Sequence, residues 1–234
     1  MRYLLMAAAA AFALAGFART DDKKSDAGGW NDDFSAEKAD LAHTGKNPYF
    51  VLEPGYQLVF EDGKERNVIT VLNETKTVDG VECRVIEERE TNDGKLVEVS
   101  RNYYAISKRT NSVYYFGEDV DMYKDGKVTG HDGSWLSGKD GARFGLMMPG
   151  LPLAGSKFYQ EVAPKVAMDR AEVVGVRETV KTPAGEFKNC VKFEETTPLE
   201  PKTKDYTWYA PGVGLVQSGD QKLVKYGKVD LPKK

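Results

Sequence analysis

The sequence predicts an all-β protein, an antiparallel β-barrel or strongly curved half-barrel of about ten or eleven strands. From residue 47 onward, short runs of β-branched and aromatic residues alternate with turn dipeptides, and no segment keeps a 3.6-residue hydrophobic period. Asp-Gly pairs between such runs are typical of β-hairpins, because Gly accepts the positive φ angle of a type I′ turn. Successive hairpins therefore predict a sheet that meanders.

Residues 1–18 have the pattern of a secretory signal peptide. Arg2 precedes an apolar, Ala-rich run that ends in small residues. This run is shorter than the ~20 apolar residues that span a bilayer, and Phe17 follows Gly16 where a lipoprotein signal would need Cys. We expect cleavage after Ala18, with Ala15 as the alternative. The mature protein is then periplasmic or secreted, with no lipid anchor and no transmembrane segment.

The rest of the chain divides into a polar tether and one β domain. Residues 19–46 are polar and predict a flexible tether with one helical turn near 36–41. Residues 47–234 form a single predicted β domain. Its expected strands are 56–60, 67–78, 81–91, 96–108, 113–120, 157–162, 166–182, 186–196, 205–210, 214–217 and 223–226.

Two stretches of this domain, 47–128 and 149–228, resemble each other weakly. Each has a turn with Gly, then a strand with one cysteine and two glutamates, then two aromatic residues followed by Ala. The features are Gly80, Cys83, Glu87-Glu88 and Tyr103-Tyr104-Ala105 in the first stretch, and Gly185, Cys190, Glu194-Glu195 and Trp208-Tyr209-Ala210 in the second. They indicate either two similar halves of one barrel or a coincidence among short hairpins.

The composition excludes several classes of protein. The 33 Lys and Arg residues against 36 Asp and Glu residues give a formal charge of −3, which argues against nucleic-acid binding. Two cysteines cannot build a disulfide-dense scaffold or a four-thiolate zinc site, and two histidines leave little for a histidine-based centre. Cys83 and Cys190 are either bridged in an oxidising compartment or two separate buried thiols.

The only cofactor that the sequence suggests is Ca²⁺, in the acidic and Gly-rich segment 116–135. Glu118, Asp119 and Asp121 would offer the carboxylate oxygens that this ion prefers. Their spacing is not that of an EF-hand loop, and Asp and Gly are also what a solvated hairpin requires. The solvated hairpin is the favoured interpretation, and otherwise we expect no cofactor.

Aromatic and Met residues are the candidates for ligand binding. A cupped sheet lined by aromatic rings suits an apolar ligand, and Met adapts to varied apolar shapes. The apolar segment 145–155 would either plug one end of the barrel or line the mouth of a pocket. The alternative is that all these side chains are core. The candidate ligand-binding residues are Tyr104, Tyr115, Trp135, Met147, Met148 and Tyr159.

No catalytic motif is present: the chain has no nucleophile elbow, no zinc-protease motif and no P-loop. Glu118, Glu161 and Glu195 are the candidates for a pair of carboxyl groups in a hydrolase, and the distance between them would decide. The sequence therefore favours a protein that is not an enzyme.

A series of motifs gives a resemblance to a known family. They are Asn47-Pro48-Tyr49-Phe50 with Leu52 and Pro54-Gly55, Tyr115-Phe116-Gly117-Glu118-Asp119, Gly133-Ser134-Trp135, Tyr159-Gln160-Glu161, Thr197-Pro198-Leu199-Glu200-Pro201 and Tyr209-Ala210-Pro211-Gly212-Val213-Gly214-Leu215-Val216. In this order they resemble a widespread family of exported bacterial proteins with one such β domain. That family has no assigned activity, so the resemblance implies an exported β protein and supplies no catalytic residues. The Tyr-Ala-Pro-Gly ending also looks like that of lipocalin-like carriers and envelope β half-barrels, an analogy of fold alone.

These observations lead to one main hypothesis and two alternatives. We expect an exported, non-enzymatic β-barrel that binds an apolar or amphipathic small molecule or an envelope protein, with no nucleic-acid partner. The alternatives are a calcium-stabilised extracellular binding module and a carboxylate-dependent hydrolase.

Overall fold

The computed structural model describes residues 29–231; the predicted signal peptide lies outside them. One 3₁₀ helix, η1 (Ser35–Asp40), precedes the strands. The strands are β1 (Leu41–Ala42), β2 (Tyr56–Asp62), β3 (Glu65–Val78), β4 (Val81–Asn92), β5 (Lys95–Ser107), β6 (Val113–Lys124), β7 (Lys127–Gly130), β8 (Trp135–Leu136), β9 (Arg143–Met148), β10 (Lys157–Tyr159), β11 (Glu161–Val162), β12 (Arg170–Thr182), β13 (Gly185–Thr196), β14 (Asp205–Ala210), β15 (Gly214–Ser218) and β16 (Gln221–Lys228). Within residues 29–231, no helix has the length and apolar character to cross a membrane.

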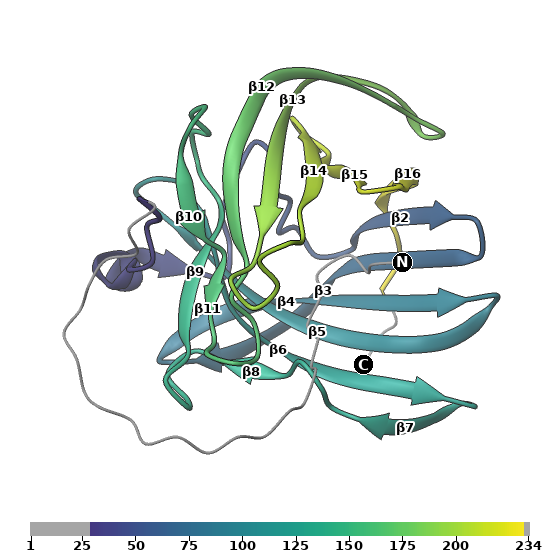
Figure 1. Cartoon of the computed structure of the whole chain (residues 1–234), viewed down its shortest axis with the longest axis horizontal. Coiled ribbons are helices and arrows are strands. Elements are labelled where there is room, and N and C mark those ends of the chain that lie inside the picture. Colours follow the sequence, from purple (N-terminus) through teal and green to yellow (C-terminus); the bar gives the residue numbers. More distant parts are fainter. Residues whose placement is uncertain (1–28, 232–234) are drawn as a thin grey trace.

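The strands form one antiparallel sheet that is rolled into a nearly closed barrel (Figure 1). Thirteen strands follow a continuous path, from β10 through β12–β16 to β2–β6 and then to β9 and β11. The all-β barrel prediction is therefore confirmed, but the predicted number of strands was too low. The extra strands in the described chain are mostly short pieces such as β7, β8 and β11.

One short segment brings the two ends of this path together. The sequence predicts a single strand over 157–162, but the structure divides it at Gln160 into β10 and β11. Strand β10 pairs with β12 at one end of the sheet, whereas β11 pairs with β9 at the other. The backbone N–H of Gln160 donates to the carbonyl of Asp169 at 2.8 Å. The chain itself therefore connects the two ends of the barrel.

The predicted hairpin turns are confirmed. Four of the Asp-Gly pairs each join two paired strands, β2 to β3, β3 to β4, β4 to β5 and β6 to β7. Asp79, Asp93 and Asp125 have φ angles of 48°, 51° and 52°, and the glycine after each is also positive. This is the backbone geometry of a type I′ turn.

The two stretches with similar sequences occupy successive meanders of the sheet. The strand path contains two similar runs of five antiparallel strands, β10-β12-β13-β14-β15 and, after β16, β2-β3-β4-β5-β6. Gly55 and Gly155, which precede β2 and β10, both have φ of 84°. Each donates its N–H to a carbonyl in the strand that pairs with the one it precedes, at 2.8 Å to Val71 of β3 and 2.8 Å to Val173 of β12. The duplication itself stays a prediction.

The described part of the expected tether, residues 29–46, lies against the barrel. Phe34 is only 8% exposed and packs on Tyr114 with 5.7 Å between ring centroids. Strand β1 pairs with β5, and Asn31 forms a parallel bridge to Phe158 of β10. This segment therefore covers both an edge strand and part of the outer surface of the sheet.

Residues 47–54 cover one end of the barrel. The Asn47 side chain donates to the carbonyls of Asn111 at 2.8 Å and Pro149 at 3.2 Å. The N–H of Gly212 donates to the Pro48 carbonyl at 2.7 Å. The apolar segment 145–155 behaves differently: it begins within β9, and its later residue Leu151 is 75% exposed. The expected plug is thus supplied mainly by residues 47–54.

Candidate functional site

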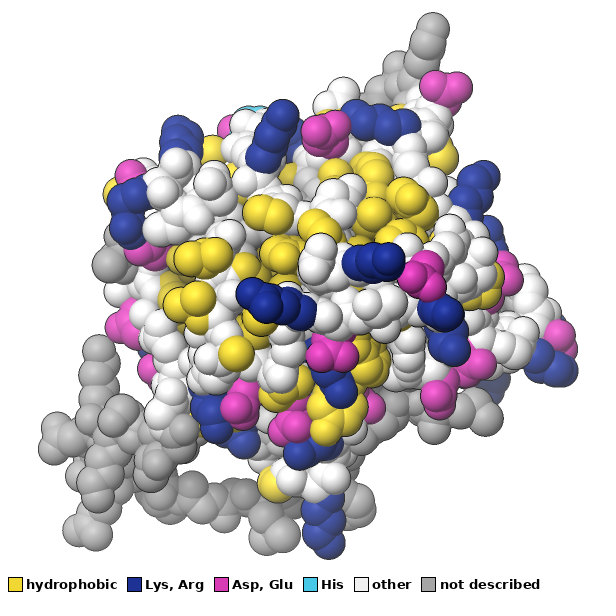
Figure 2. All heavy atoms as spheres, turned by 90° about the horizontal axis from the view of Figure 1, so that it is seen from above, with side chains coloured by type: hydrophobic (Ala, Val, Ile, Leu, Met, Phe, Trp, Pro, Cys, Tyr) yellow, Lys and Arg dark blue, Asp and Glu magenta, His cyan; other side chains and the backbone are white. Residues whose placement is uncertain are grey.

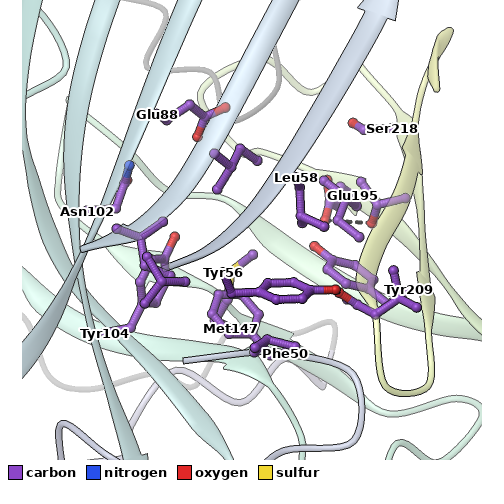
Figure 3. A pocket seen from close by; sticks show the side chains of 18 residues that line it. Phe50, Tyr56, Leu58, Glu88, Asn102, Tyr104, Met147, Glu195, Tyr209 and Ser218 are labelled. Carbon is purple, nitrogen blue, oxygen red and sulfur yellow. Dashed lines mark hydrogen bonds between the residues drawn. The ribbon is translucent and has the colours of Figure 1, made fainter. Parts of the chain in front are cut away.

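The barrel contains a partly open cavity of about 80 Å³ between its two meanders (Figure 3). For comparison, an engineered apolar cavity of about 150 Å³ accepts benzene. The enclosed part therefore suits a compact ligand or one end of a longer one. The lining residues are Phe50, Val51, Tyr56, Leu58, Ile69, Val71, Ile86, Glu88, Asn102, Tyr104, Met147, Glu195, Thr207, Tyr209, Val213, Gly214, Leu215 and Ser218.

Most of the cavity wall is apolar and comes from residues that alternate along the strands. Period-2 alternation places Leu58 of β2 and Val71 of β3 on the inner face. Phe50, from the covering segment, packs on Tyr104 with 5.0 Å between ring centroids. Tyr56 donates its hydroxyl to the carbonyl of Val213 at 2.9 Å and is partly exposed. This hydrogen bond ties β2 to the turn before β15 at the edge of the cavity.

Two carboxyl groups enter this apolar cavity from opposite walls. Glu88 lies on β4 and Glu195 on β13, which are six positions apart in the path of thirteen strands (Figure 3). They also occupy corresponding places in the two similar stretches of sequence. No Lys, Arg or His is among the residues that line the cavity in the described chain.

The two carboxyl groups have different neighbours. Glu88 is 3% exposed and accepts a hydrogen bond from the Asn67 side-chain amide. Burial raises its pKa to about 8, and Asn67 opposes that shift. Glu195 is partly exposed and accepts from the Thr207 hydroxyl at 2.9 Å and the Gln160 amide at 3.3 Å. Burial raises the pKa of Glu195 to about 7, since these hydrogen bonds offset part of the desolvation.

More acidic groups surround these two inside the barrel. Burial, together with the charge of Glu88, raises the pKa of Glu90 to about 9. Burial also raises the pKa of Glu118 and of Glu161 well above the ordinary range. Desolvation favours the neutral form of each acid, and the negative neighbours add to the effect. These buried acids therefore stay protonated to a higher pH than ordinary carboxyl groups.

The predicted ligand-binding residues separate into two groups. Tyr104 and Met147 line the cavity. Behind them, Tyr115 stacks on Tyr104 with 4.8 Å between centroids, and Trp135 meets Tyr115 at 5.2 Å. Two other candidates, Met148 and Tyr159, are buried but do not line the cavity. Four of the six thus support the wall or the core.

The three predicted calcium ligands do not share one face of β6. Glu118 is buried inside the barrel. Asp119 pairs with Lys76 at 2.6 Å and accepts from the Tyr103 hydroxyl at 2.6 Å. Asp121 lies 2.9 Å from a ring nitrogen of His131. Period-2 alternation explains the separation. Residues 29–231 bring together no group of three acidic, His or Cys side chains suited to a metal, and the calcium site stays a prediction.

The three acids proposed for hydrolysis all lie inside the barrel, but only Glu195 lines the cavity. Glu161 is 2% exposed; its Oε1 accepts from the Asp169 backbone N–H at 2.8 Å, and its Oε2 has no hydrogen-bond partner. Glu118 is 6% exposed. The arrangement leaves one of the three, Glu195, in contact with the space that a ligand would occupy.

Both cysteines are free and buried, which favours the alternative of two separate thiols. Burial raises the pKa of Cys83 to about 12 and that of Cys190 to about 11. Protonated, buried thiols are poor nucleophiles.

Sequence reasoning missed Glu88 as a cavity residue. The signal was present in the weak repeat, because Glu87-Glu88 matches Glu194-Glu195. Since Glu195 was already a candidate, the repeat singles out Glu88 as its counterpart.

A second surface combines aromatic and basic groups on the outside of the barrel. Lys192 lies 4.0 Å from the ring centroid of Tyr206 and 5.0 Å from that of Trp208. Arg170 lies 4.5 Å from the ring of Trp30. Figure 2 views the side where β12 and β13 arch over the molecule, and hydrophobic side chains gather there among Lys and Arg. Two further lysines form ion pairs, Lys157 with Glu172 at 3.1 Å and Lys204 with Glu194 at 2.9 Å.

A family described as DUF3108-like, which is uncharacterised, matches residues 160–226. The matched stretch runs from β11 into β16 and so covers most of the second meander, including Glu195. No curated protein and no solved structure matched the chain. The chain is therefore similar to this family over 67 of its 234 residues, and the similarity supplies no activity.

Proposed function

We propose that this protein is an exported, non-enzymatic β-barrel that binds an apolar or amphipathic small molecule in its central cavity. The observation that carries the proposal is the cavity itself, which is apolar over most of its wall and has a few polar groups on opposite sides. Ligand sites in proteins have this composition, because apolar walls supply affinity and convergent polar groups orient the ligand. The signal peptide pattern of residues 1–18 supports export.

Titration with linear alcohols from butanol to decanol tests the binding function. Each methylene that enters the cavity is expected to strengthen binding by ~0.8 kcal/mol, about fourfold, until the enclosed space is full. Isothermal titration calorimetry on the mature protein measures this series. An affinity that does not depend on chain length, or no binding at all, contradicts the proposal.

A cavity-filling variant locates the site. Leu58→Trp is expected to abolish alcohol binding, because Leu58 lines the cavity on β2. The matched control is Leu151→Trp, at a side chain that is 75% exposed. Circular dichroism shows whether each variant is folded. If Leu58→Trp binds as the parent does, the ligand lies elsewhere.

Export has its own test. Expression of the full chain in a bacterium is expected to place the protein in the periplasm or medium, beginning at Arg19 by mass spectrometry. Native mass spectra of that material would also reveal a retained ligand or an envelope protein. An intact N-terminus in the cytoplasm contradicts export.

A further inference from the structure

The inside of the barrel is chemically polarised. Phe50, Leu58 and Met147 form an apolar part of the cavity wall, whereas Glu88 and Glu195 bring two carboxyl groups to it. A ligand that fills this space would therefore place an apolar body against the first group and a polar head near the second.

Resting on the proposed function, we propose that the ligand is a cationic amphiphile, an apolar molecule whose protonated amine lies between Glu88 and Glu195. The cavity wall carries these two carboxyl groups and no Lys, Arg or His among the described residues. An ammonium group has three donors and pairs with carboxylate oxygens, so it can donate to a carboxyl group on either wall. An anionic head, such as that of a fatty acid, would meet only acids.

The amide beside Glu88 also lacks a partner. Asn67 is 1% exposed and donates its Nδ2 to Glu88, but its Oδ1 has no hydrogen-bond partner. A buried acceptor without a partner is unfavourable, and a cation with several donors near Glu88 would relieve that cost. This acceptor therefore adds to the preference for a donor-rich head.

The charges around the two carboxyl groups act in the same direction. Next to Glu88, the acids are Glu90 on the same strand, Glu98 on β5 and Glu118 on β6. Next to Glu195, they are Asp169, Asp205 and Glu161. The uncharged neighbours are Asn67, Gln160, Thr207, Tyr104 and Tyr209. None of these named neighbours carries a positive charge that would repel a cation.

Binding must also depend on pH. Burial keeps the pKa of Glu88 near 8 and that of Glu195 near 7 in the free protein, so an ammonium ion has to displace a proton at neutral pH. Affinity for the amine should rise from pH 6 to pH 8 by about tenfold if Glu195 is the carboxyl group that pairs with it and by about fiftyfold if Glu88 is, because a larger fraction of that carboxyl group is then already ionised. A neutral head group does not need an ionised carboxyl group, so its affinity should not rise with pH.

Three probes that share the same alkyl chain length test the choice of head group. They are octylamine, octanol and octanoate, titrated by calorimetry at pH 6, 7 and 8. We expect octylamine to bind at least about tenfold more tightly than octanoate at pH 8, with octanol between them, and only octylamine to gain affinity with pH. Equal affinities of all three would overturn the cationic ligand and leave the binding function intact. If none of the three binds, the proposed function fails as well.

Variants assign the preference to the two carboxyl groups. Glu88→Gln with Glu195→Gln is expected to make octylamine and octanol bind equally, while Glu82→Gln, at an exposed side chain near the start of β4, keeps the difference. If the double variant is unfolded by circular dichroism, Glu195→Gln alone, at a partly exposed side chain, should reduce the preference. An unchanged preference in a folded variant would place the amine elsewhere and overturn the inference.

Discussion

The ionisation of Glu88 is expected to weaken the folded state as the pH rises. Burial raises the pKa of this carboxyl from 4.5 to about 8 in the folded protein. The folded state therefore keeps a proton that the unfolded chain releases between these two values. Its contribution to stability is fully present below pH 4.5 and is lost as the pH rises through 8.

The size of the effect follows from the shift. A change of about 3.5 pKa units corresponds to about 5 kcal/mol at ~1.4 kcal/mol per unit. This is a ceiling for one group, since Glu88 and Glu90 influence each other and share part of the shift. Whole domains are stable by only 5–15 kcal/mol, so even half of this ceiling is measurable.

Urea denaturation at pH 5, 6, 7, 8 and 9, followed by tryptophan fluorescence, measures the slope. The parent protein should lose stability with rising pH, by up to ~1.4 kcal/mol per unit for each buried acid that titrates. Glu88→Gln keeps the shape of the side chain without the charge, so it should be more stable than the parent at pH 9 and show a shallower slope. Glu82→Gln, at an exposed side chain near the start of the same strand, should follow the parent.

A parent protein whose stability rises from pH 5 to 9 would refute the reasoning. So would a Glu88→Gln variant with an unchanged slope, because it would mean that Glu88 is solvated in the folded state. A variant that is less stable than the parent at every pH would show that the carboxyl makes a favourable interaction beyond the hydrogen bond from Asn67.

Two substitutions and one chemical treatment test the packing of the barrel. Asn47→Ala should lower stability by about 1–3 kcal/mol in urea titrations, because the carbonyls of Asn111 and Pro149 lose a donor. Gly150→Ala should cost at least about 1–3 kcal/mol, since its Cβ would lie 1.8 Å from the Thr110 carbonyl oxygen; an unchanged melting temperature would contradict this contact. The two buried thiols should react with a thiol reagent only on unfolding, and dithiothreitol should leave the melting temperature unchanged.

The hairpins of the fold were predictable because their turns are local. Each Asp-Gly pair determines its own backbone conformation, and alternation then assigns faces to the adjoining strands. Tyr103 and Tyr104 illustrate the second point: the Tyr103 hydroxyl meets Asp119 near the surface, whereas Tyr104 lines the cavity.

The closure of the barrel was not predictable in the same way. Nothing in residues 157–162 indicates that the strand changes partner at Gln160, because the choice between β12 and β9 depends on pairings distant in sequence. The covering of the barrel end by residues 47–54 depends likewise on hydrogen bonds of Asn47 to residues far along the chain.

Only part of the candidate site was predictable from the sequence. The aromatic and Met residues of the wall stand out by composition, but Glu88 is one of several acids in an ordinary-looking strand, Val81–Asn92. What separates Glu88 from Glu87 is its face of the strand, whereas Glu82 shares that face and differs from Glu88 in depth. The depth depends on how far the sheet curls, a property of the whole meander.

The buried acids connect stability to the proposed ligand. A barrel selected only for stability would fill its interior with apolar side chains, since a buried carboxyl without a cation is costly. Here the same carboxyl groups that weaken the fold at high pH would gain most from an ammonium ion, which lowers their pKa by favouring the charged form. Glu88→Gln should therefore raise stability at pH 9 and reduce the preference for octylamine. If Glu88→Gln raised the stability at pH 9 but left the preference for octylamine unchanged, Glu88 would affect only the fold, and the head group of the ligand would bind elsewhere in the cavity.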